Sequence, residues 1–297
     1  MVLPKYYELY KPFLLAIKDQ QIHSIREIKE TVANNLNLSD DALSELLPSG
    51  KQTIYSNRIG WARTYLKKAG LIDSPQRAQF VITNEGINLL NSGVEITDAL
   101  LAKKYSGFAE FVGGKVATTD NKTENVDNTE TPLETLERVH QKINSQIADE
   151  LLNEIMKQSA KFFENLVVDL MKAMGYGDGF VTKTSGDGGI DGIIHEDKLG
   201  FNLIYIQAKR WNVETSIGRP EIQKFAGAMM GPPKIGKGLF ITTAKFSQNA
   251  KEFADAQHII LVDGKKLTEL MMEYNLGVFT QKVYTIKKID SDYFLDD

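Results

Sequence analysis

The segment from Gly186 to Arg210 constrains the fold of this chain more than any other. It reads Gly-Asp-Gly-Gly-Ile-Asp-Gly-Ile-Ile at 186–194, continues through a charged turn at 195–200, and ends in Leu-Ile-Tyr-Ile-Gln-Ala-Lys at 203–209. Two short β-branched runs joined by a turn predict a β-hairpin. The two runs are therefore expected to be neighbours in a sheet, and the side chains at their ends are expected to meet.

The predicted hairpin brings together side chains with complementary chemistry. The first run carries Asp191, and the second carries Gln207 and Lys209, which point to the same face because side chains alternate along a strand. Carboxylate and amide oxygens suit a hard cation such as Mg²⁺. Such an ion polarises a phosphate and lowers the pKa of an attacking water, while a lysine orients that water or stabilises the developing charge. We therefore predict a phosphodiester-hydrolysing site with Mg²⁺, or Mn²⁺ in its place, as cofactor.

Asp191 followed by Gln207-Ala208-Lys209 resembles the D…QxK variant of the PD-(D/E)xK nuclease signature. With the glycines of 186–192 and with Arg210-Trp211, the ordered set resembles the Mrr restriction proteins, which are type IV, modification-dependent endonucleases. The resemblance covers nearly the whole chain. It implies that the metal is held by Asp191, Gln207 and the backbone carbonyl of Ala208. Gln207 departs from the usual carboxylate and supplies an oxygen without negative charge.

Further motifs extend the resemblance, and each has an ordinary structural alternative. Glu164, on a predicted helix at about 160–174, matches the family's helix glutamate and completes the catalytic set with Asp191, Gln207 and Lys209; a first-turn Glu favoured by the helix dipole is the alternative. Asp191 among glycines is also a common turn residue, and Lys209 could be a solvated strand-end lysine. Asp187 is predicted to serve the turn rather than the metal. Two downstream matches lie at Gly218–Glu221 and Gly238–Thr243.

Charge is distributed unevenly along the chain. The net charge is −4, but residues 118–158 alone hold 4 basic and 9 acidic residues, whereas 51–84 hold six Lys or Arg and one Asp. Nucleic-acid binding depends on such local patches rather than on the total. No apolar run approaches the ~20 residues that span a bilayer, and the absence of cysteine excludes disulfides and thiolate metal sites. We expect a cytoplasmic protein without a membrane partner.

Residues 1–95 follow the order of a winged helix. Apolar residues at helical spacing predict helices over 5–18 and 53–69, and Ser24 with Glu27 predicts a capping box that opens a helix between them. A small hairpin follows at about 71–83. The helix at 53–69 is the predicted recognition helix, which in such modules enters the major groove, and residues 73–80 are the predicted wing.

The basic residues of this module are the predicted contacts to double-stranded DNA. Arg58, Lys67 and Lys68 are expected to anchor the helix on phosphates, while Asn57 faces base edges. The alternatives are a solvated helix face and a protein-interaction module; the family resemblance favours DNA. The complete set of candidates is Asn57, Arg58, Arg63, Lys67, Lys68 and Arg77 here, with Arg210 and Arg219 in the second domain.

A connecting region is predicted between the two domains. Residues 96–133 are expected to form a linker that is disordered over about 118–132, where apolar side chains are almost absent. An amphipathic helix at 134–158 is expected to pack on the second domain, with a dimer contact as the alternative. Residues 159–297 alternate strand and helix, which implies parallel crossovers, and an edge strand is expected at Lys282–Ile286.

The predicted fold is an α/β catalytic domain, with a mixed sheet flanked by helices, plus a mainly α winged-helix domain. We expect a homodimeric, Mg²⁺-dependent endonuclease that cleaves modified, especially methylated, foreign DNA in a restriction system. The alternatives are a non-enzymatic winged-helix DNA-binding protein with a degenerate nuclease fold, and a DNA repair or junction nuclease. The intact set of Asp191, Gln207 and Lys209 argues against the first, and the amino-terminal module against the second. The glycine-rich loop lacks the Walker pattern, so no ATP requirement is expected.

Overall fold

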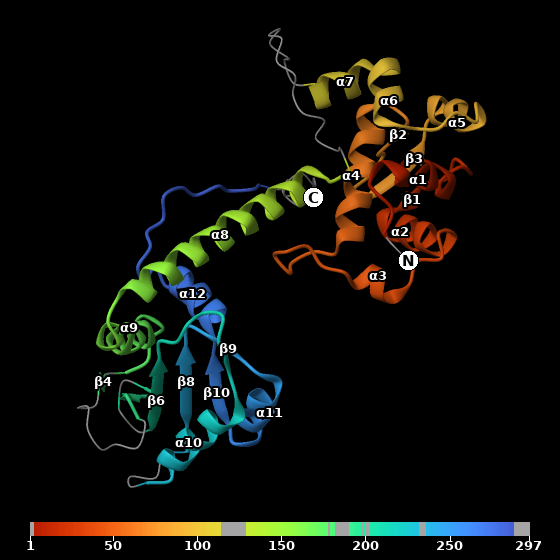
Figure 1. Cartoon of the computed structure of the whole chain (residues 1–297). Coiled ribbons are helices and arrows are strands. Elements are labelled where there is room, and N and C mark those ends of the chain that lie inside the picture. Colours follow the sequence, from red (N-terminus) through yellow and green to blue (C-terminus); the bar gives the residue numbers. More distant parts are fainter. Residues whose placement is uncertain are drawn as a thin grey trace. The chain divides into compact units, whose positions relative to one another are not determined.

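The structure of the protein is a computed structural model that forms two compact units, one within residues 1–142 and the other comprising Ile143–Lys287 (Figure 1). It describes residues 3–113, 129–177, 179–181, 190–197, 199, 202–231 and 236–287. None of the helices in this part of the chain combines the length and apolarity required to cross a membrane.

The first unit has the element order expected of a winged helix. A helix precedes a short strand, further helices follow, and two more strands complete a small sheet with the first. Strand β3 lies between β1 and β2 and pairs antiparallel with both. The elements are η1 (Tyr7–Leu9), α1 (Tyr10–Ala16), β1 (His23–Ser24), α2 (Ile25–Asn35), α3 (Asp40–Ser44), α4 (Ile54–Lys68), β2 (Ile72–Asp73), β3 (Gln79–Ile82) and α5 (Asn84–Asn91).

Local sequence signals set the ends of these helices. The predicted capping box at α2 is present: Ser24 Oγ accepts from the Glu27 amide at 3.2 Å, and the Glu27 carboxylate accepts from the Ser24 amide at 2.7 Å. Thr53 caps α4 in the same way, through the Ser56 amide. Gly70 follows α4 with a φ of +71°, a left-handed conformation that glycine adopts without strain.

The predicted linker at 96–133 is partly folded. It contains α6 (Asp98–Lys104) and α7 (Ser106–Gly113). Leu101 and Phe108 from these helices are fully buried in the core of the first unit, and the Asp98 carboxylate accepts hydrogen bonds from the Tyr6 and Tyr10 hydroxyls at 2.5 and 2.6 Å. The linker prediction was therefore wrong for these helices, because their apolar faces complete an aromatic core. The segment predicted to be disordered spans about 118–132, and its residues 118–128 lie outside the described part of the chain.

Helix α8 (Pro132–Lys157) covers the residues of the predicted connecting helix. Its first turns belong to the first unit, and its last turns belong to the second. Leu151 and Ile155 are buried in the core of the second unit, as the prediction of packing on that domain requires.

The second unit is built on a mixed sheet, as predicted. Its strand order is β10-β8-β6-β5-β4; the pairs among β4, β5 and β6 are antiparallel, and those among β6, β8 and β10 are parallel. A separate parallel pair joins β7 to β9. The strands are β4 (Gly179–Val181), β5 (Gly192–His195), β6 (Leu203–Lys209), β7 (Ser216–Ile217), β8 (Gly238–Thr242), β9 (Lys245–Phe246) and β10 (Ile259–Val262).

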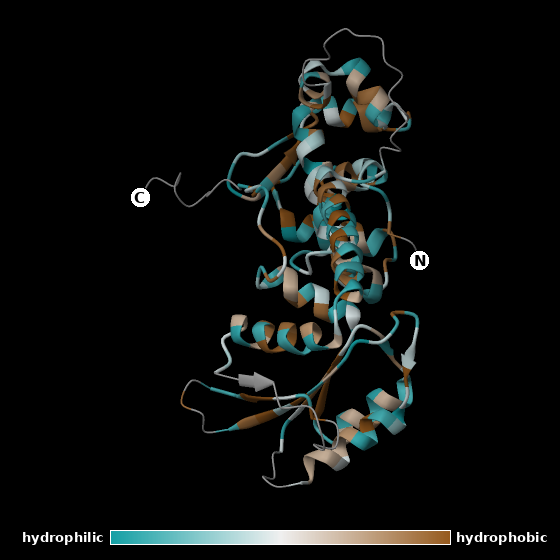
Figure 2. Ribbon diagram, turned by 60° about the vertical axis from the view of Figure 1, so that its left-hand side comes forward, coloured by the Kyte–Doolittle hydropathy of each residue, from teal (hydrophilic) through white to brown (hydrophobic). Residues whose placement is uncertain are grey.

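Helices cover both faces of this sheet. On one face α9 (Ala160–Ala173) and α12 (Gly264–Glu273) pack on Ile204, Ile206 and Ala208 of β6. On the other face α10 (Arg219–Met229) and α11 (Gln248–Ala256) pack around Tyr205 and Phe240. Figure 2 shows the hydrophobic strands lying between helices with hydrophilic outer faces. Because both faces are buried, the strands are nearly continuous apolar runs.

The edge strand predicted at Lys282–Ile286 does not form. Residues 278–287 have neither helix nor strand, and Phe279, Val283, Tyr284 and Ile286 are 67–85% exposed. The prediction was wrong because β-branched and aromatic residues give a segment strand propensity without supplying a strand to pair with.

Candidate active site and DNA-binding surface

The β5–β6 hairpin places Asp191 beside the end of β6. Gly192 pairs with Ile206, so Asp191 stands opposite Gln207 one residue further along the antiparallel register. The Asp191 amide donates to the Ile206 carbonyl at 2.9 Å, and its carboxylate Oδ2 accepts from the Ala208 amide at 2.9 Å. The hairpin predicted from the sequence therefore holds this carboxylate by backbone hydrogen bonds.

Lys209 lies beside the same carboxylate. Its Nζ is 3.7 Å from Asp191 Oδ2, and the two side chains are 33% and 17% exposed. Gln207 is only 5% exposed and shares a face of β6 with Lys209, because side chains alternate along the strand. The structure thus brings Asp191, Gln207 and Lys209 to one place, as the sequence predicted.

Burial makes the Asp191 carboxylate a stronger base than an ordinary aspartate. Desolvation raises its pKa, the Ala208 amide and the Lys209 ammonium oppose that change, and the negative charge of Glu164 adds to it. Glu164 is therefore within electrostatic reach of Asp191, across from the hairpin on α9. A bound cation would stabilise both carboxylates in their charged forms.

Glu164 lies near the start of α9 and is largely shielded from solvent. Its side chain is 15% exposed, and Oε2 accepts from Lys161 Nζ at 3.2 Å. Ser159 begins the helix by accepting a hydrogen bond from the Phe162 amide, so the helix start is fixed by an N-cap.

The donor atoms at this place fit a hard divalent cation. Two carboxylates, one amide side chain and a backbone carbonyl offer oxygen, the donor that Mg²⁺ and Mn²⁺ prefer. Within the described ranges no group of three or more His, Cys, Asp or Glu residues could hold a metal ion, so a cation beside Asp191 would also need oxygens from Gln207 and the backbone. Asp187, a further sequence candidate, lies outside the described residues.

Two threonines that the sequence analysis did not assign to the site hold the chain just beyond Lys209. Thr242 at the end of β8 is fully buried, and its hydroxyl donates to the Lys209 carbonyl at 2.6 Å. The Thr243 hydroxyl donates to the Trp211 carbonyl. In the sequence, this role is indicated by two adjacent hydroxyl residues at the end of an apolar strand. They lie in the segment Gly238–Thr243, which is one of the downstream matches to the family.

Arg210, a predicted phosphate contact, makes a hydrogen bond inside the second unit. Its Nη1 donates to the Met156 carbonyl in the last turn of α8 at 2.8 Å. Its Nε is buried and has no hydrogen-bond partner among the described residues. One side of the guanidinium is thus engaged inside the second unit, and Arg210 as a whole is half-buried.

The amino-terminal part of α4 is also covered. Asn57 is 3% exposed and its Nδ2 donates to Thr131 Oγ1 at 2.5 Å. Arg58 Nε donates to Glu134 Oε1 at 2.8 Å, with side-chain exposures of 17% and 8%, and Nη1 donates to the carbonyls of Leu3 and Pro4. In this structure neither side chain faces solvent, contrary to the prediction that Arg58 anchors the helix on DNA and Asn57 faces bases.

The covering segment is the first turn of α8. Thr131 and Glu134 form a capping box, in which the Glu134 carboxylate accepts from the Thr131 amide at 2.7 Å and Thr131 Oγ1 accepts from the Glu134 amide at 3.2 Å. One turn later, Glu137 accepts from both the amide and the hydroxyl of Ser49. The polar surface at the start of α4 is therefore satisfied from within the chain.

Most of the other basic candidates lie at exposed positions, whereas Arg63 is half-buried. Lys67 and Lys68 lie exposed in the last turn of α4, and Lys68 Nζ is 4.9 Å from the centre of the Phe111 ring. Arg77 is exposed between β2 and β3, where the wing was predicted. Arg63 stacks over Phe80 at 5.6 Å, and burial lowers the pKa of its guanidinium. Arg219 is exposed over the ring of Phe253 at 5.0 Å.

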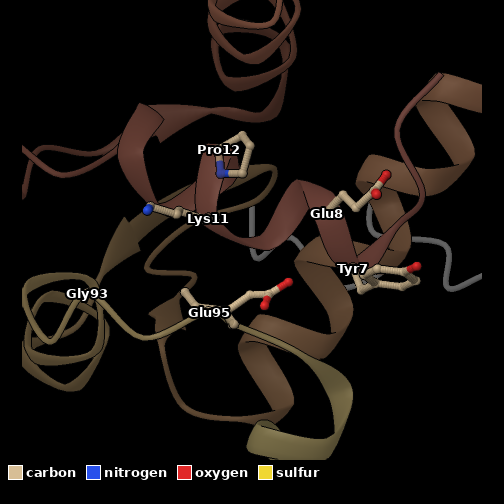
Figure 3. A pocket seen from close by; sticks show the side chains of 7 residues that line it. Tyr7, Glu8, Lys11, Pro12, Gly93 and Glu95 are labelled. Carbon is tan, nitrogen blue, oxygen red and sulfur yellow. The ribbon is translucent and has the colours of Figure 1, made fainter. Parts of the chain in front are cut away.

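A hollow of about 410 Å³ lies on the first unit, away from these residues. It is lined by Tyr7, Glu8, Lys11, Pro12, Gly93, Glu95 and Ile96. Figure 3 shows the Tyr7 and Glu8 side chains pointing away from Lys11, so its polar groups do not converge on a common ligand. This hollow therefore lacks the convergent polar groups of a binding site.

Comparison with known proteins decides the family. A model of the Mrr amino-terminal domain matches residues 6–92, and a restriction endonuclease model, the Mrr catalytic domain, matches residues 155–271. The type IV methyl-directed restriction enzyme EcoKMrr of Escherichia coli strain K12 is 35% identical over 312 residues, covering 99% of this chain and 100% of the relative. The chain belongs to the Mrr family of restriction endonucleases.

Membership of the Mrr family confirms the class expected from the sequence. The chain is a restriction endonuclease, an enzyme class that acts on DNA and typically uses a divalent metal ion. Two solved structures are distantly similar: the DNA modification-dependent restriction endonuclease AspBHI (15% identity, TM-score 0.38, covering 70% of this chain and 56% of that chain) and MspJI in complex with a 27-mer oligonucleotide (16% identity, TM-score 0.30, covering 67% and 49%). Scores this low do not establish a common arrangement.

Proposed function

We propose that this protein is a Mg²⁺-dependent type IV endonuclease that cleaves methylated double-stranded DNA in the cytoplasm as a homodimer. The observation that carries the proposal is the placement of Lys209 Nζ 3.7 Å from the Asp191 carboxylate, beside buried Gln207. The relative EcoKMrr is described as methyl-directed, which supports the choice of substrate.

The proposed metal ligands are Asp191, Gln207 and the backbone carbonyl of Ala208. Mg²⁺, with Mn²⁺ as an alternative, would polarise the scissile phosphate and lower the pKa of a bound water. The Ala208 amide fixes one oxygen of Asp191, which leaves the remaining lone pairs of the carboxylate for the ion. Since Gln207 contributes no charge, the negative charge of Glu164 near the site supports cation binding.

Lys209 is the proposed orienting and charge-stabilising group. Its ammonium lies beside Asp191 yet is one-third exposed, so it can reach both a water molecule and a phosphate oxygen. A cation held in this way stabilises the negative charge that develops on the phosphate. Thr242 supports the position of Lys209, because its hydroxyl holds the Lys209 carbonyl.

DNA recognition is proposed to lie mainly in the first unit. The winged-helix element order and the exposed Lys67, Lys68 and Arg77 support phosphate contacts there. Arg219 is the proposed contact in the second unit. Arg58 and Asn57 would meet DNA only if the first turn of α8 moved from α4, because Glu134 and Thr131 hold them in this structure.

An apolar stripe on α8 supports the proposed homodimer. Leu136, Val139 and Ile143 recur at spacings of three and four and are 42–52% exposed. Side chains at these spacings share one helix face. A second copy of the same helix would remove this stripe from water.

Cleavage assays with methylated and unmethylated plasmid, each with Mg²⁺ or with EDTA, test the proposal. We expect Mg²⁺-dependent cleavage of the methylated plasmid. Lys209→Ala and Asp191→Ala should each reduce the rate by about 10³-fold or more, whereas Lys251→Ala, an exposed lysine on α11, should not. Tight DNA binding without cleavage by the wild type would instead support a non-enzymatic DNA-binding protein, and wild-type rates in Lys209→Ala would refute the site.

A further inference from the structure

Arg210 joins the end of β6 to the last turn of α8. It directly follows Lys209, the last residue of β6. Its Nη1 donates to the carbonyl of Met156, 54 residues earlier in the chain, at 2.8 Å. A single side chain thus connects the end of the strand that carries Lys209 to the last turn of α8.

The last turn of a helix has carbonyls without partners inside the helix. Met156 is the penultimate residue of α8, and a cation there also interacts favourably with the negative end of the helix dipole. The chain then turns sharply: the Gln158 amide donates to the Ile155 carbonyl at 3.1 Å, and Ser159 caps α9. Arg210 therefore holds the corner between α8 and α9.

The corner between α8 and α9 determines where Glu164 lies. Glu164 is in the second turn of α9, and its charge acts on Asp191. Ile155 before the corner and Phe163 after it pack in the same core as Ala208 of β6. These apolar contacts hold α8 and α9 against β6. The Arg210 hydrogen bond adds a fixed link between β6 and α8 at the end of the strand that carries Lys209.

We propose that Arg210 is a positioning residue that holds the corner between α8 and α9, and with it Glu164, against the strand that carries Gln207 and Lys209. The inference rests on the proposed function, since it assigns to Glu164 a place beside the metal ligands. It also replaces the predicted role of Arg210 as a phosphate contact. Nε is buried and Nη1 already donates to the Met156 carbonyl, so only part of the guanidinium fork is left for a phosphate.

Arg210→Met and Arg210→Lys separate these roles, with Lys251→Met on the surface of α11 as the control. Methionine retains much of the apolar length but has no donor, while a lysine ammonium can reach one carbonyl without the planar fork of arginine. We would measure Mn²⁺ binding by calorimetry in the absence of DNA, the nicking rate against Mg²⁺ concentration, DNA affinity against salt concentration, and thermal stability.

Arg210→Met should weaken Mn²⁺ binding about tenfold and slow nicking at saturating metal by roughly 10- to 100-fold, the range seen when a residue supporting metal ligands is lost. Arg210→Lys should recover part of both. The salt dependence of DNA affinity should match that of the wild type, because no phosphate contact is removed.

Three results would overturn the proposal. In the first, Arg210→Met binds Mn²⁺ and nicks DNA as Lys251→Met does. In the second, the salt slope falls by about 0.9, the value for one lost phosphate contact, while Mn²⁺ binding is unchanged. In the third, both Arg210 variants lose thermal stability and keep wild-type Mn²⁺ affinity, which identifies a purely structural role. If the wild type fails to cut DNA, the proposed function fails, but the Mn²⁺ titrations still test the positioning role.

Discussion

The buried ion pair between Arg58 and Glu134 allows a quantitative prediction. Its two atoms are 2.8 Å apart, and both side chains are largely removed from water, at 17% and 8% exposure. The variants are Glu134→Gln, Arg58→Met and the double variant. Glutamine can still accept from the Thr131 amide, as the glutamine of a capping box does, so the first variant removes charge while keeping the turn.

The expected loss in free energy of unfolding follows from the hydrogen bonds that Arg58 keeps in the variant. Breaking a buried pair by removing one partner costs about 3–5 kcal/mol. Arg58 in the glutamine variant keeps the carbonyls of Leu3 and Pro4 as acceptors, so we expect about 1.5–3 kcal/mol, the contribution of a hydrogen bond to a charged group. For a unit of this size, that loss lowers the melting temperature by roughly 5–10 °C. The double variant should lose less than the sum of the single losses.

Fluorescence can follow the first unit alone. The chain has two tryptophans, and Trp61 lies in α4 with its ring 5.6 Å from that of Tyr65. In a Trp211→Phe background, urea unfolding of the variants would therefore report on this unit. The exposed pair of Arg26 and Glu30, with side chains 87% and 61% exposed, is the matched control, with a coupling of about 0.3–0.5 kcal/mol. The reasoning would be refuted if the losses in free energy of unfolding of Arg58→Met and Glu134→Gln add up to the loss of the double variant to within about 0.5 kcal/mol.

Two further predictions concern the metal site. Gln207→Glu adds a charged ligand, so the Mg²⁺ concentration that gives half the maximal nicking rate should fall; an unchanged titration would show that Gln207 does not bind the metal. Burial raises the pKa of Asp191, and a metal requires the deprotonated carboxylate. As the pH is lowered, Mn²⁺ affinity should therefore begin to fall at a higher pH than it would if Asp191 had the pKa of an ordinary aspartate. The raised pKa also means that the Asp191 contribution to metal-free stability is present below its unfolded pKa and is lost as pH rises through the folded value. Calorimetry and thermal unfolding between pH 4 and 8 would test both effects, and a Mn²⁺ affinity that stays flat across this range would contradict them.

The sequence predicted the hairpin site well because the relevant constraints are local. The alternation of side chains in a strand places Gln207 and Lys209 on one face, and a short turn brings Asp191 to the neighbouring strand. Proximity of Asp191 to Lys209 then follows from hairpin geometry, and the structure confirms it. The role of Thr242 required knowledge of which strand lies beside β6, and the sequence alone does not determine that neighbour.

The surface of α4 was predicted less well because it depends on distant parts of the chain. Asn57 and Arg58 are polar residues on a basic helix, which is the usual pattern of an exposed face. Their partners Thr131 and Glu134 are 74 and 76 residues later, beyond a segment of almost entirely polar composition. The helices at 98–113 were missed for a related reason: Phe108 is recognised as a core residue only once the aromatic side chains around it are known.

The shared helix α8 limits how freely the two halves of this protein can be exchanged with those of other proteins. A fusion point within the polar stretch at 118–128 would separate Arg58 from Glu134 and leave a buried guanidinium without its counterion. A fusion point near Gln141, in the exposed middle of α8, keeps that pair with the first half and leaves Ile155 with the second. Chimaeras that carry a foreign recognition module should therefore be joined inside the helix, with the spacing of its apolar residues preserved, rather than in the stretch that looks like a linker.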